Sequence, residues 1–293
     1  MAESRSDWTV LQMLEWATGY FEDKEITNAR LSIEWLLSFV LKVKRLDLYL
    51  MFDRPLTEDE LQVLRPLVKR RALHEPLQYI LGEADFYGFT FEVKPGVLIP
   101  RPETEQLVEL ILNDHQESKD LQVLDVGTGS GCIPIALKKK RDDWTLRATD
   151  ISEDALSIAK ANAAKLNADV HFLLDDLFNP STEVLAQKVN VLASNPPYIL
   201  ESEKSGLDKE VKQFEPELAL FCESTAKMYG ALKKLGEKIL APSGAIYLEL
   251  NERFGKEVIA LFSDPIWDVQ LIPDYAGKDR FLKGKIISKK TDF

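Results

Sequence analysis

The stretch that decides the fold is Val123-Leu124-Asp125-Val126-Gly127-Thr128-Gly129-Ser130-Gly131. Its first four residues predict a short buried strand. The glycines at every second position after it predict a loop whose backbone can come close to a ligand, and the apolar residues 135–137 predict a helix behind that loop. In this order of strand, loop and helix, the N–H groups at the helix start point at the ligand.

Two further strands are predicted to end in acidic residues. Residues 145–149 lead to Asp150, whose carboxylate can accept both hydroxyls of a ribose. An N-cap role is the alternative for Asp150, although Ser152 could fill that role itself. Residues 170–174 lead to Asp175-Asp176-Leu177, where Asp176 could receive an adenine amino group while Leu177 packs on the ring. A solvated acid at a strand end is the alternative for Asp176.

A fourth strand, residues 189–194, is followed by Asn195-Pro196-Pro197-Tyr198. Two consecutive prolines cannot continue a sheet ladder, because neither has an N–H group and each fixes its φ angle. The chain therefore leaves the sheet in a stiff turn that presents the Asn195 side chain, the Pro196 carbonyl and the Tyr198 ring. A planar amide or an aromatic amine could pack on that ring while its two N–H groups bind the Asn195 oxygen and the free carbonyl.

The alternation of strands and helices predicts an α/β fold with a doubly wound, mostly parallel sheet and a ligand site outside the carboxyl ends of its strands. An antiparallel strand is expected at the C-terminus, as suits a methyltransferase sheet better than that of a dinucleotide dehydrogenase. The later elements are predicted at residues 226–240 (helix), 245–250 (strand), 254–262 (helix), and 269–272 and 281–287 (strands).

The first third of the chain predicts a small helical bundle over residues 1–75. Apolar spacing indicates helices near residues 8–21 and 29–40, and Thr57 with Glu60 has the spacing of a capping box. Lys69-Arg70-Arg71 at the end of that third helix is interpreted as a cationic helix terminus rather than a binding patch. A role in partner recognition and a role as a plain structural cap both stay open.

Residues 76–102 are predicted to join the bundle to the sheet domain, residues 103–293. Alternation that begins at Tyr79 and Leu81 and continues through residues 86–93, with a turn at Lys94-Pro95-Gly96, predicts a β-hairpin. Ile99-Pro100-Arg101-Pro102-Glu103-Thr104-Glu105 then predicts a stiff turn into a helix that starts near Glu103.

Composition sets the outer limits of function. The 293 residues carry a net charge of −11, which argues against a surface built mainly to bind phosphate backbones. Two cysteines and three histidines give neither a disulfide framework nor zinc-ligand spacing, so no metal and a reducing, cytoplasmic setting are expected. The segment Met1 to Asp7 shows no signal-peptide pattern, and no apolar run is long enough to span a membrane.

Together these motifs resemble the class I S-adenosylmethionine-dependent methyltransferases. They resemble most closely the HemK/PrmC family, which methylates the glutamine of the Gly-Gly-Gln loop in peptide-chain release factors. Asn-Pro-Pro-Tyr alone also occurs in DNA adenine and ribosomal RNA guanine methyltransferases. The segments that carry the resemblance are Arg54-Pro55-Leu56, Glu75-Pro76-Leu77-Gln78-Tyr79-Ile80-Leu81-Gly82, the stretch from Ile99 to Glu105, the glycine loop, Asn195 to Tyr198, and Gly277-Lys278-Asp279-Arg280-Phe281.

The resemblance implies a Rossmann-like methyltransferase domain, a bundle that docks the release factor, and S-adenosylmethionine as cofactor. It assigns cofactor binding to Gly127, Thr128, Gly129, Ser130, Gly131, Asp150, Asp176, Leu177 and Asn195. It assigns the substrate glutamine to Asn195, Pro196, Pro197 and Tyr198, with Asn195, Pro196 and Tyr198 as the catalytic group. Cys222-Glu223-Ser224-Thr225 replaces a segment that usually begins with two glycines in the family, at the expected substrate rim.

Two rival functions follow from the same residues. Methylation of an exocyclic amino group on a flipped nucleic-acid base uses the same Asn195 corner, but it calls for a basic channel or an added recognition segment. A binding module that keeps the fold without turnover is disfavoured by the intact glycine loop and the intact Asn195 corner. The expected protein is a monomeric enzyme that acts on release factors, without a nucleic-acid or membrane partner.

Overall fold

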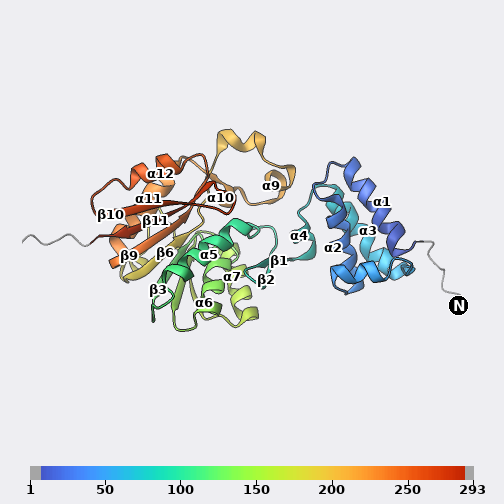
Figure 1. Ribbon diagram of the computed structural model, residues 1–293, viewed down its shortest axis with the longest axis horizontal. Coiled ribbons are helices and arrows are strands. Elements are labelled where there is room, and N and C mark those ends of the chain that lie inside the picture. The colour runs from blue at the N-terminus through green and yellow to red at the C-terminus, as the bar shows by residue number, and fades with distance from the viewer. Residues whose placement is uncertain (1–7, 288–293) are drawn as a thin grey trace, which may run out of the picture. The chain divides into compact units, whose positions relative to one another are not determined.

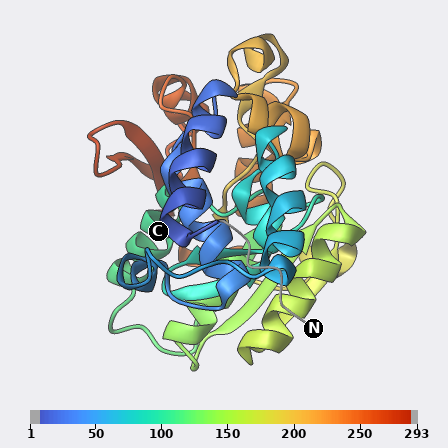
Figure 2. The same ribbon diagram turned by 90° about the vertical axis from the view of Figure 1, so that its right-hand side faces the viewer.

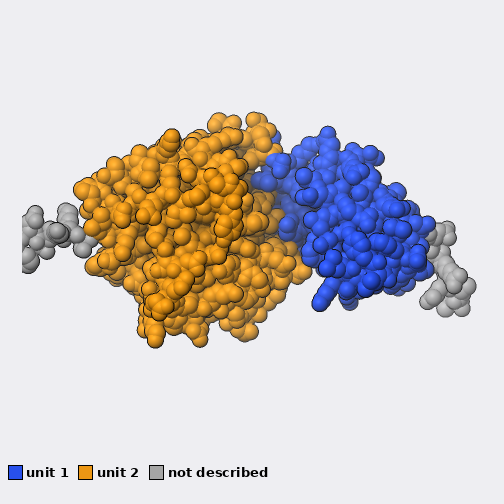
Figure 3. Space-filling model, in the orientation of Figure 1, with its two compact units in different colours: residues 1–82, 208–214 blue, residues 83–207, 215–293 orange. Residues whose placement is uncertain are grey.

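The computed structural model describes residues 8–287 and divides the chain into two compact units (Figures 1 and 3). Unit 1 contains residues 1–82 and 208–214, and unit 2 contains residues 83–207 and 215–293. A helical bundle was predicted for residues 1–75. Unit 1 contains, in addition, the short helix α4, Leu77–Leu81, and the distant segment 208–214. The segment Met1 to Asp7, where no signal-peptide pattern was found, lies outside the described residues.

Unit 1 is a bundle of helices that lie side by side in Figures 1 and 2. Thr9 and Thr57 cap two of them: the hydroxyl of each accepts an N–H of the first turn, and Gln12 or Glu60 binds back to the cap backbone. The predicted capping box at Thr57 is therefore confirmed. The helices are α1 Val10–Asp23, α2 Ala29–Leu41, the 3-10 helix η1 Arg45–Leu50, α3 Glu58–Ala72 and α4.

A sixth helix of unit 1 comes from the middle of the chain. Helix α9, Lys209–Phe214, is joined to the bundle by Glu210, whose Oε1 accepts a hydrogen bond from Arg71 Nη2 at 2.6 Å. Arg71 is only 3% exposed and also donates to Ser32 Oγ at 3.1 Å. Lys69, Arg70 and Arg71 lie in the last turn of α3, which agrees with their interpretation as a cationic helix end. Arg71 has a further role that was not predicted, as a buried bridge between α2, α3 and α9.

A β-hairpin opens unit 2, formed by β1 Glu83–Phe86 and β2 Phe89–Glu92. Its two-residue turn is Tyr87-Gly88, both at positive φ, as a tight hairpin turn requires. The hairpin was predicted, but its turn was expected at Lys94-Pro95-Gly96, and Tyr79 and Leu81 were expected to alternate. Those two residues belong to helix α4 instead.

The main sheet of unit 2 has seven strands in the order β10-β11-β9-β6-β3-β4-β5. Every neighbouring pair is parallel except the two that involve β11, which runs antiparallel to both β9 and β10. The predicted mostly parallel sheet with an antiparallel C-terminal strand is confirmed. The strands are β3 Gln122–Val126, β4 Thr145–Asp150, β5 Val170–Leu174, β6 Val189–Ser194, β9 Leu240–Glu249, β10 Trp267–Pro273 and β11 Asp279–Ile286.

Helices cover both faces of this sheet because its strands are apolar on both sides. Val123 packs into the core under helices α5 Pro102–Asp114 and α6 Cys132–Lys140, while the next residue, Leu124, packs under α11 Thr225–Ile239. Helix α7, Glu153–Leu166, contributes Ala163 to the first core, and α12, Gly255–Leu261, contributes Val258 to the second. The layers are visible in Figure 1. All five predicted strands from residue 123 to residue 250 are present.

Short elements follow the Asn195 corner. Strand β7, Ile199–Leu200, pairs in parallel with β8, Phe221–Cys222, and the 3-10 helix η2, Glu201–Gly206, and α10, Glu217–Leu220, lie in the segment that joins them. Ser224, in the segment that departs from the family pattern, caps α11 by accepting the N–H of Lys227. Among the helices of residues 8–287, none combines the length and the apolar character needed to cross a membrane.

Candidate active site

A cavity of about 370 Å³ lies at the carboxyl ends of β3, β4, β5 and β6, entirely within unit 2. Its volume is within the ordinary range for a small-molecule site. Of the residues assigned from the sequence, it is lined by Gly127, Gly129, Asp150, Asp176, Leu177, Asn195, Pro196 and Pro197. Thr128, Ser130, Gly131 and Tyr198 do not line it.

The glycine loop presents its backbone to this cavity. Gly129 adopts φ +55°, and no atom lies within 4 Å of the position that a Cβ would take there, so a side chain would occupy free space beside the cavity. Gly131 is needed for a different reason. At φ +80°, its Cβ would lie 3.0 Å from Ile135 Cδ1 and 3.1 Å from Ala159 Cβ, so a side chain would push α6 and α7 apart.

Asp150 closes the loop from the end of β4. Its Oδ2 accepts the Gly129 N–H at 2.8 Å and its Oδ1 accepts the Ser152 N–H at 2.9 Å. Burial raises the pKa of this carboxyl above its ordinary value, and the backbone N–H groups oppose that shift. The cap of α7 is Ser152, whose hydroxyl accepts the Ala155 N–H, so the alternative role of Asp150 as that N-cap is excluded.

At the end of β5, Asp176 and Leu177 line the same cavity. Asp176 Oδ1 accepts the Phe178 N–H at 2.9 Å, which fixes the carboxylate in a local turn and leaves Oδ2 for another donor. The neighbouring Asp175 is held in the same way by the Ser181 N–H, also at 2.9 Å. The two acidic residues are therefore structured rather than freely solvated.

The Asn195 corner is held by a buried hydrogen-bond series. Asn195 Nδ2 donates to Thr104 Oγ1 at 2.9 Å, and Thr104 Oγ1 donates to Glu249 Oε2 at 2.8 Å. Tyr198 donates its hydroxyl to the other carboxylate oxygen, Oε1, at 3.5 Å. Glu249 thus binds Tyr198 directly and Asn195 through Thr104. Burial raises the pKa of the Tyr198 phenol, so this hydroxyl stays a neutral donor.

Thr104 and Glu249 were not predicted as site residues. They are 2% and 1% exposed, and burial raises the pKa of Glu249 to about 7. Tyr229 donates to the Glu249 backbone carbonyl at 2.9 Å, which fixes the end of β9. One signal was present in the sequence, because Glu249 is a carboxylate near the end of an otherwise apolar strand, and such a group needs a specific partner when buried.

A second buried carboxyl lies behind the glycine loop. Asp125 is fully buried, and neither of its oxygens meets the geometry of a hydrogen bond with another group among residues 8–287. Burial raises its pKa to about 7, and the nearby Thr128 side chain opposes that rise. The hydroxyls of Thr128 and Ser130 are likewise buried without a partner in the described part of the chain. The wall behind the loop therefore contains buried polar atoms whose hydrogen-bonding capacity is not met by neighbouring protein groups.

Two rim segments of the cavity are joined by an ion pair. Arg101 Nη2 lies 2.5 Å from Glu215 Oε1, and Glu215 Oε2 accepts the Ile99 N–H at 3.4 Å. The segment before Arg101 contributes Val97 and Leu98 to the cavity lining, and the segment after Glu215 contributes Pro216, Leu218 and Ala219. The ion pair therefore holds together two walls that are distant in sequence.

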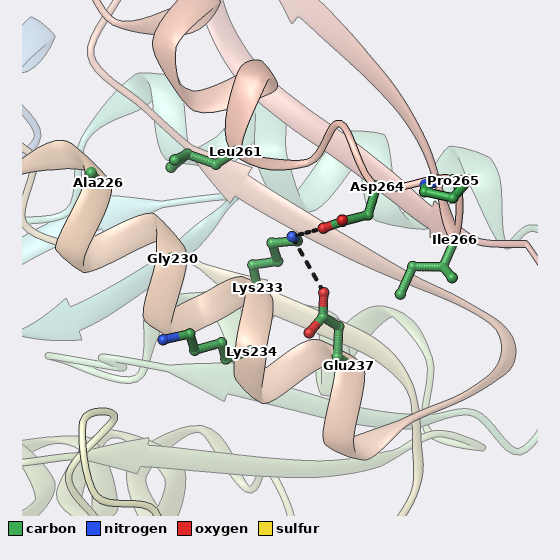
Figure 4. A pocket seen from close by; sticks show the side chains of 9 residues that line it. All are labelled: Ala226, Gly230, Lys233, Lys234, Glu237, Leu261, Asp264, Pro265 and Ile266. Atoms are coloured by element: carbon green, nitrogen blue, oxygen red, sulfur yellow. Dashed lines mark hydrogen bonds and ion pairs between the residues drawn. The ribbon is translucent and has the colours of Figure 1, made fainter.

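A larger hollow of about 690 Å³, shown in Figure 4, is lined by α11 and the segment before β10. Its central cation, Lys233, is paired with Asp264 and, at 3.5 Å, with Glu237. Lys233 is thus already paired with two carboxylates, and none of the residues assigned from the sequence lies there. In the described range of the chain, no group of three His, Cys, Asp or Glu side chains could hold a metal ion.

The cavity fits an adenosyl ligand by its own chemistry. Gly129 leaves open space beside the wall, Asp150 offers carboxylate oxygens, and Leu177 and Phe178 offer apolar surface. S-adenosylmethionine has a ribose, an adenine ring and a charged amino acid end, which match these groups. The residues present therefore fit this cofactor.

Comparisons with known proteins agree with this site. The family description "PrmC N-terminal domain" matches residues 12–82, and "Methyltransferase small domain" matches residues 90–212. A release factor glutamine methyltransferase of Bacteroides thetaiotaomicron is 41% identical over 83% of this chain and 87% of that protein. The Geobacter sulfurreducens protein of the same name is 38% identical over 98% of this chain and 100% of its own.

Among solved structures, the 16S rRNA N2 G1207 methyltransferase of T. thermophilus, determined with AdoMet and guanosine, matches with a TM-score of 0.50 and 15% identity. The match covers 70% of this chain and 49% of that chain, and it shows the fold alone. The relatives of high identity span both units and nearly the full length of their own chains. The chain therefore belongs to the family of release factor glutamine methyltransferases.

Proposed function

We propose that the chain transfers a methyl group from S-adenosylmethionine to the side-chain amide nitrogen of the glutamine in the Gly-Gly-Gln motif of peptide-chain release factors. One observation carries the proposal. Asn195, a residue suited to hold an NH2 group, lines the same cavity as Gly129 and Asp150, which are suited to hold a nucleoside. The relatives, which are release factor glutamine methyltransferases by name, support the substrate class.

In the proposed complex, residues 127–131 cradle the cofactor and Asp150 receives the ribose hydroxyls. Asp176 and Leu177 flank the adenine. The cofactor supplies a methyl group on a positively charged sulfur. Thr128, Ser130 and Gly131 support the loop from behind, because their side chains or Cα positions are buried rather than part of the cavity lining.

The substrate amide needs positioning more than it needs a base. Its lone pair is delocalised into the carbonyl, so the nitrogen is a poor nucleophile. Asn195 Oδ1 and the Pro196 carbonyl accept its two hydrogens, while Pro197 and the Tyr198 ring confine its plane. Orientation of this kind is worth about 7 kcal/mol or more. The amide proton becomes acidic as the methyl group arrives, so no strong general base is required.

The release factor docks on unit 1 in this proposal, and the enzyme acts as a monomer in the cytoplasm. The family match over residues 12–82 supports a dedicated N-terminal unit. Light scattering of the purified protein at several concentrations tests the monomer. A mass twice that of the 33.3 kDa chain, held on dilution, would contradict it.

Labelled cofactor and purified release factors test the activity directly, with the label located by peptide mass spectrometry. The expected site is the glutamine of the Gly-Gly-Gln motif. The variant Asn195→Ala should bind the cofactor with a Kd near that of wild type and lose turnover by at least a hundredfold, because it removes the acceptor for the substrate amide and no group assigned to the ribose or adenine. Near-normal turnover would overturn the role of Asn195.

A matched control is Asp150→Ala, which should lose cofactor binding itself. The same assay with single-stranded and double-stranded DNA and with ribosomal RNA tests base methylation, which the relatives do not favour. Label on a nucleic acid and none on a release factor would replace the proposed function.

A further inference from the structure

The orientation of the Asn195 side-chain amide is set by groups that do not line the cavity. Its Nδ2 donates to Thr104 Oγ1, and within residues 8–287 no protein donor reaches its Oδ1. Thr104 Oγ1 donates in turn to Glu249 Oε2. The three residues, here named the orienting series, come from α5, the end of β6 and the end of β9, so distant parts of the chain meet in it.

The direction of these hydrogen bonds follows from counting protons. A hydroxyl has a single proton, and an ionised carboxylate can only accept. While Glu249 is ionised, the Thr104 proton is therefore committed to Glu249, and only lone pairs face Asn195. The Asn195 amide must then present its NH2 group to Thr104, because a flipped amide would place Oδ1 against those lone pairs.

We propose that Thr104 and Glu249 are positioning residues that hold Asn195 with Oδ1 available to the substrate amide. The inference rests on the proposed function for its catalytic consequence, since Oδ1 is there the acceptor of a substrate N–H. Without the orienting series, Asn195 can present its NH2 group instead, which repels the substrate N–H groups. Neither residue touches the substrate.

The series also makes the orientation depend on pH. Burial raises the pKa of Glu249 to about 7, and Glu103 of α5 raises it further, while Thr104, Arg280 of β11 and the Tyr198 hydroxyl lower it. Cys132 of α6 and Tyr229 of α11 face the same carboxyl, and burial leaves both neutral by raising their pKa values. Once Glu249 is protonated, it no longer demands the Thr104 proton, and both orientations of Asn195 become available.

A purely structural role is the competing explanation, in which Thr104 and Glu249 only tie α5 to the sheet. The two explanations differ in what they change. If the two residues have only a structural role, their substitution should weaken cofactor binding and turnover together. If they orient Asn195, substitution should lower kcat and leave the cofactor Kd unchanged. Only the orienting role predicts that kcat depends on pH in wild type and that this dependence disappears when Glu249 cannot ionise.

The experiment compares Thr104→Val, Thr104→Ser and Glu249→Gln with wild type, in methyl transfer to a release factor between pH 6 and 8.5. Thr104→Val should lower kcat at least tenfold and leave the cofactor Kd within twofold, while Thr104→Ser, which keeps the hydroxyl, should stay within threefold of wild type. Wild-type kcat should rise with pH through a midpoint near pH 7 to a plateau at higher pH, and Glu249→Gln, which keeps an acceptor oxygen, should lack this rise.

The matched control is Thr90→Val, the same exchange at a threonine whose hydroxyl also donates to a carboxylate, Asp85 Oδ1 at 2.8 Å, but in the hairpin outside the cavity. It should leave kcat within twofold. A Thr104→Val enzyme with kcat within twofold of wild type would overturn the proposal. A pH dependence that persists in Glu249→Gln, or an equal loss of kcat in Thr90→Val, would do the same.

A second readout needs no activity. The side-chain 15N signal of Asn195, assigned with Asn195→Ala, should shift with a midpoint near pH 7 in wild type and should lose this midpoint in Thr104→Val and Glu249→Gln. An Asn195 signal that does not titrate overturns the orienting series. If wild type transfers no methyl group to any release factor, the proposed function fails, and the nitrogen signal still decides the orienting series.

Discussion

At the scale of single residues, Asp125 is an ionisable group buried at a cost in the centre of the sheet. It is fully buried, and its pKa is raised from an ordinary value of 3.8 to about 7, with desolvation as the largest cause. Between these two values the folded protein binds more protons than the unfolded chain does. Stability therefore falls as pH rises through this window, and the full penalty is present above pH 7.

The variant Asp125→Asn removes this ionisation and keeps the shape of the side chain. Its free energy of unfolding relative to wild type should increase between pH 5 and pH 8 by about 3 kcal/mol, from roughly two pH units of linkage. Urea unfolding at both pH values measures the difference. The exposed Asp142→Asn serves as the control, with a difference that does not vary with pH. A constant difference for Asp125→Asn would refute the account of its burial.

Single residues were predictable where a motif carries them. Asp150 and Asn195 follow apolar strands directly, so their position at the carboxyl edge of the sheet could be inferred from local sequence. Thr104 and Glu249 could not be placed in this way, because they are 145 positions apart and Thr104 is 91 positions from Asn195. Only the folded sheet brings such residues together.

At the scale of elements, the cavity depends on how its rim segments are joined. The Arg101–Glu215 ion pair links the turn before α5 to the turn before α10, and the Glu215 carboxylate is almost fully buried. Removal of Arg101 leaves that carboxylate with the single N–H of Ile99, a long contact of 3.4 Å. A buried charge without its partner is strongly unfavourable, so the two segments are expected to separate.

We expect Arg101→Ala to weaken cofactor binding about tenfold, the equivalent of 1.4 kcal/mol, because Val97, Leu98 and Pro216 lose their fixed positions in the cavity wall. Calorimetric titration with S-adenosylmethionine measures this change. Arg253→Ala is the matched control, since Arg253 pairs with Glu203 at 3.1 Å on an exposed surface. Equal Kd values for the two variants would rule out a role of the Arg101–Glu215 ion pair in cofactor binding.

Apolar runs were sufficient to predict the central strands β3, β4 and β6, because most of their residues are buried and the runs are bounded by turn residues. Shorter elements were not predictable from such runs. Helix α4 spans only five residues, and the two-residue hairpin turn at Tyr87-Gly88 places a tyrosine at positive φ. Strands β7 and β8 have two residues each, and their pairing depends on contacts between distant segments of the chain.

At the scale of the whole molecule, unit 1 is assembled from two separate segments of chain. Arg71 is 3% exposed, and its carboxylate partner Glu210 lies in α9, whereas residues 207 and 215 on either side belong to unit 2. The helical bundle is therefore complete only when the segment after the Asn195 corner has joined it.

We expect Glu210→Ala to destabilise unit 1 by about 3 kcal/mol, because it leaves the buried Arg71 guanidinium without its carboxylate. Urea unfolding followed by circular dichroism measures the loss. Lys209→Ala is the control on the same helix, because its pair with Glu25 is mostly exposed, and no shift of the unfolding midpoint is expected. Equal midpoints for the two variants would show that Arg71 does not depend on α9.

The origin of α9 has a consequence for synthesis on the ribosome. Glu210 leaves the exit tunnel 139 residues after Arg71, when the first four parallel strands of the main sheet have already been made. Until then the nascent bundle carries a guanidinium whose acidic partner has not been translated. The final step in maturing the amino-terminal unit is thus set by translation of the segment that follows the Asn-Pro-Pro-Tyr turn, and a ribosome that stalls before that segment would hold an unfinished bundle.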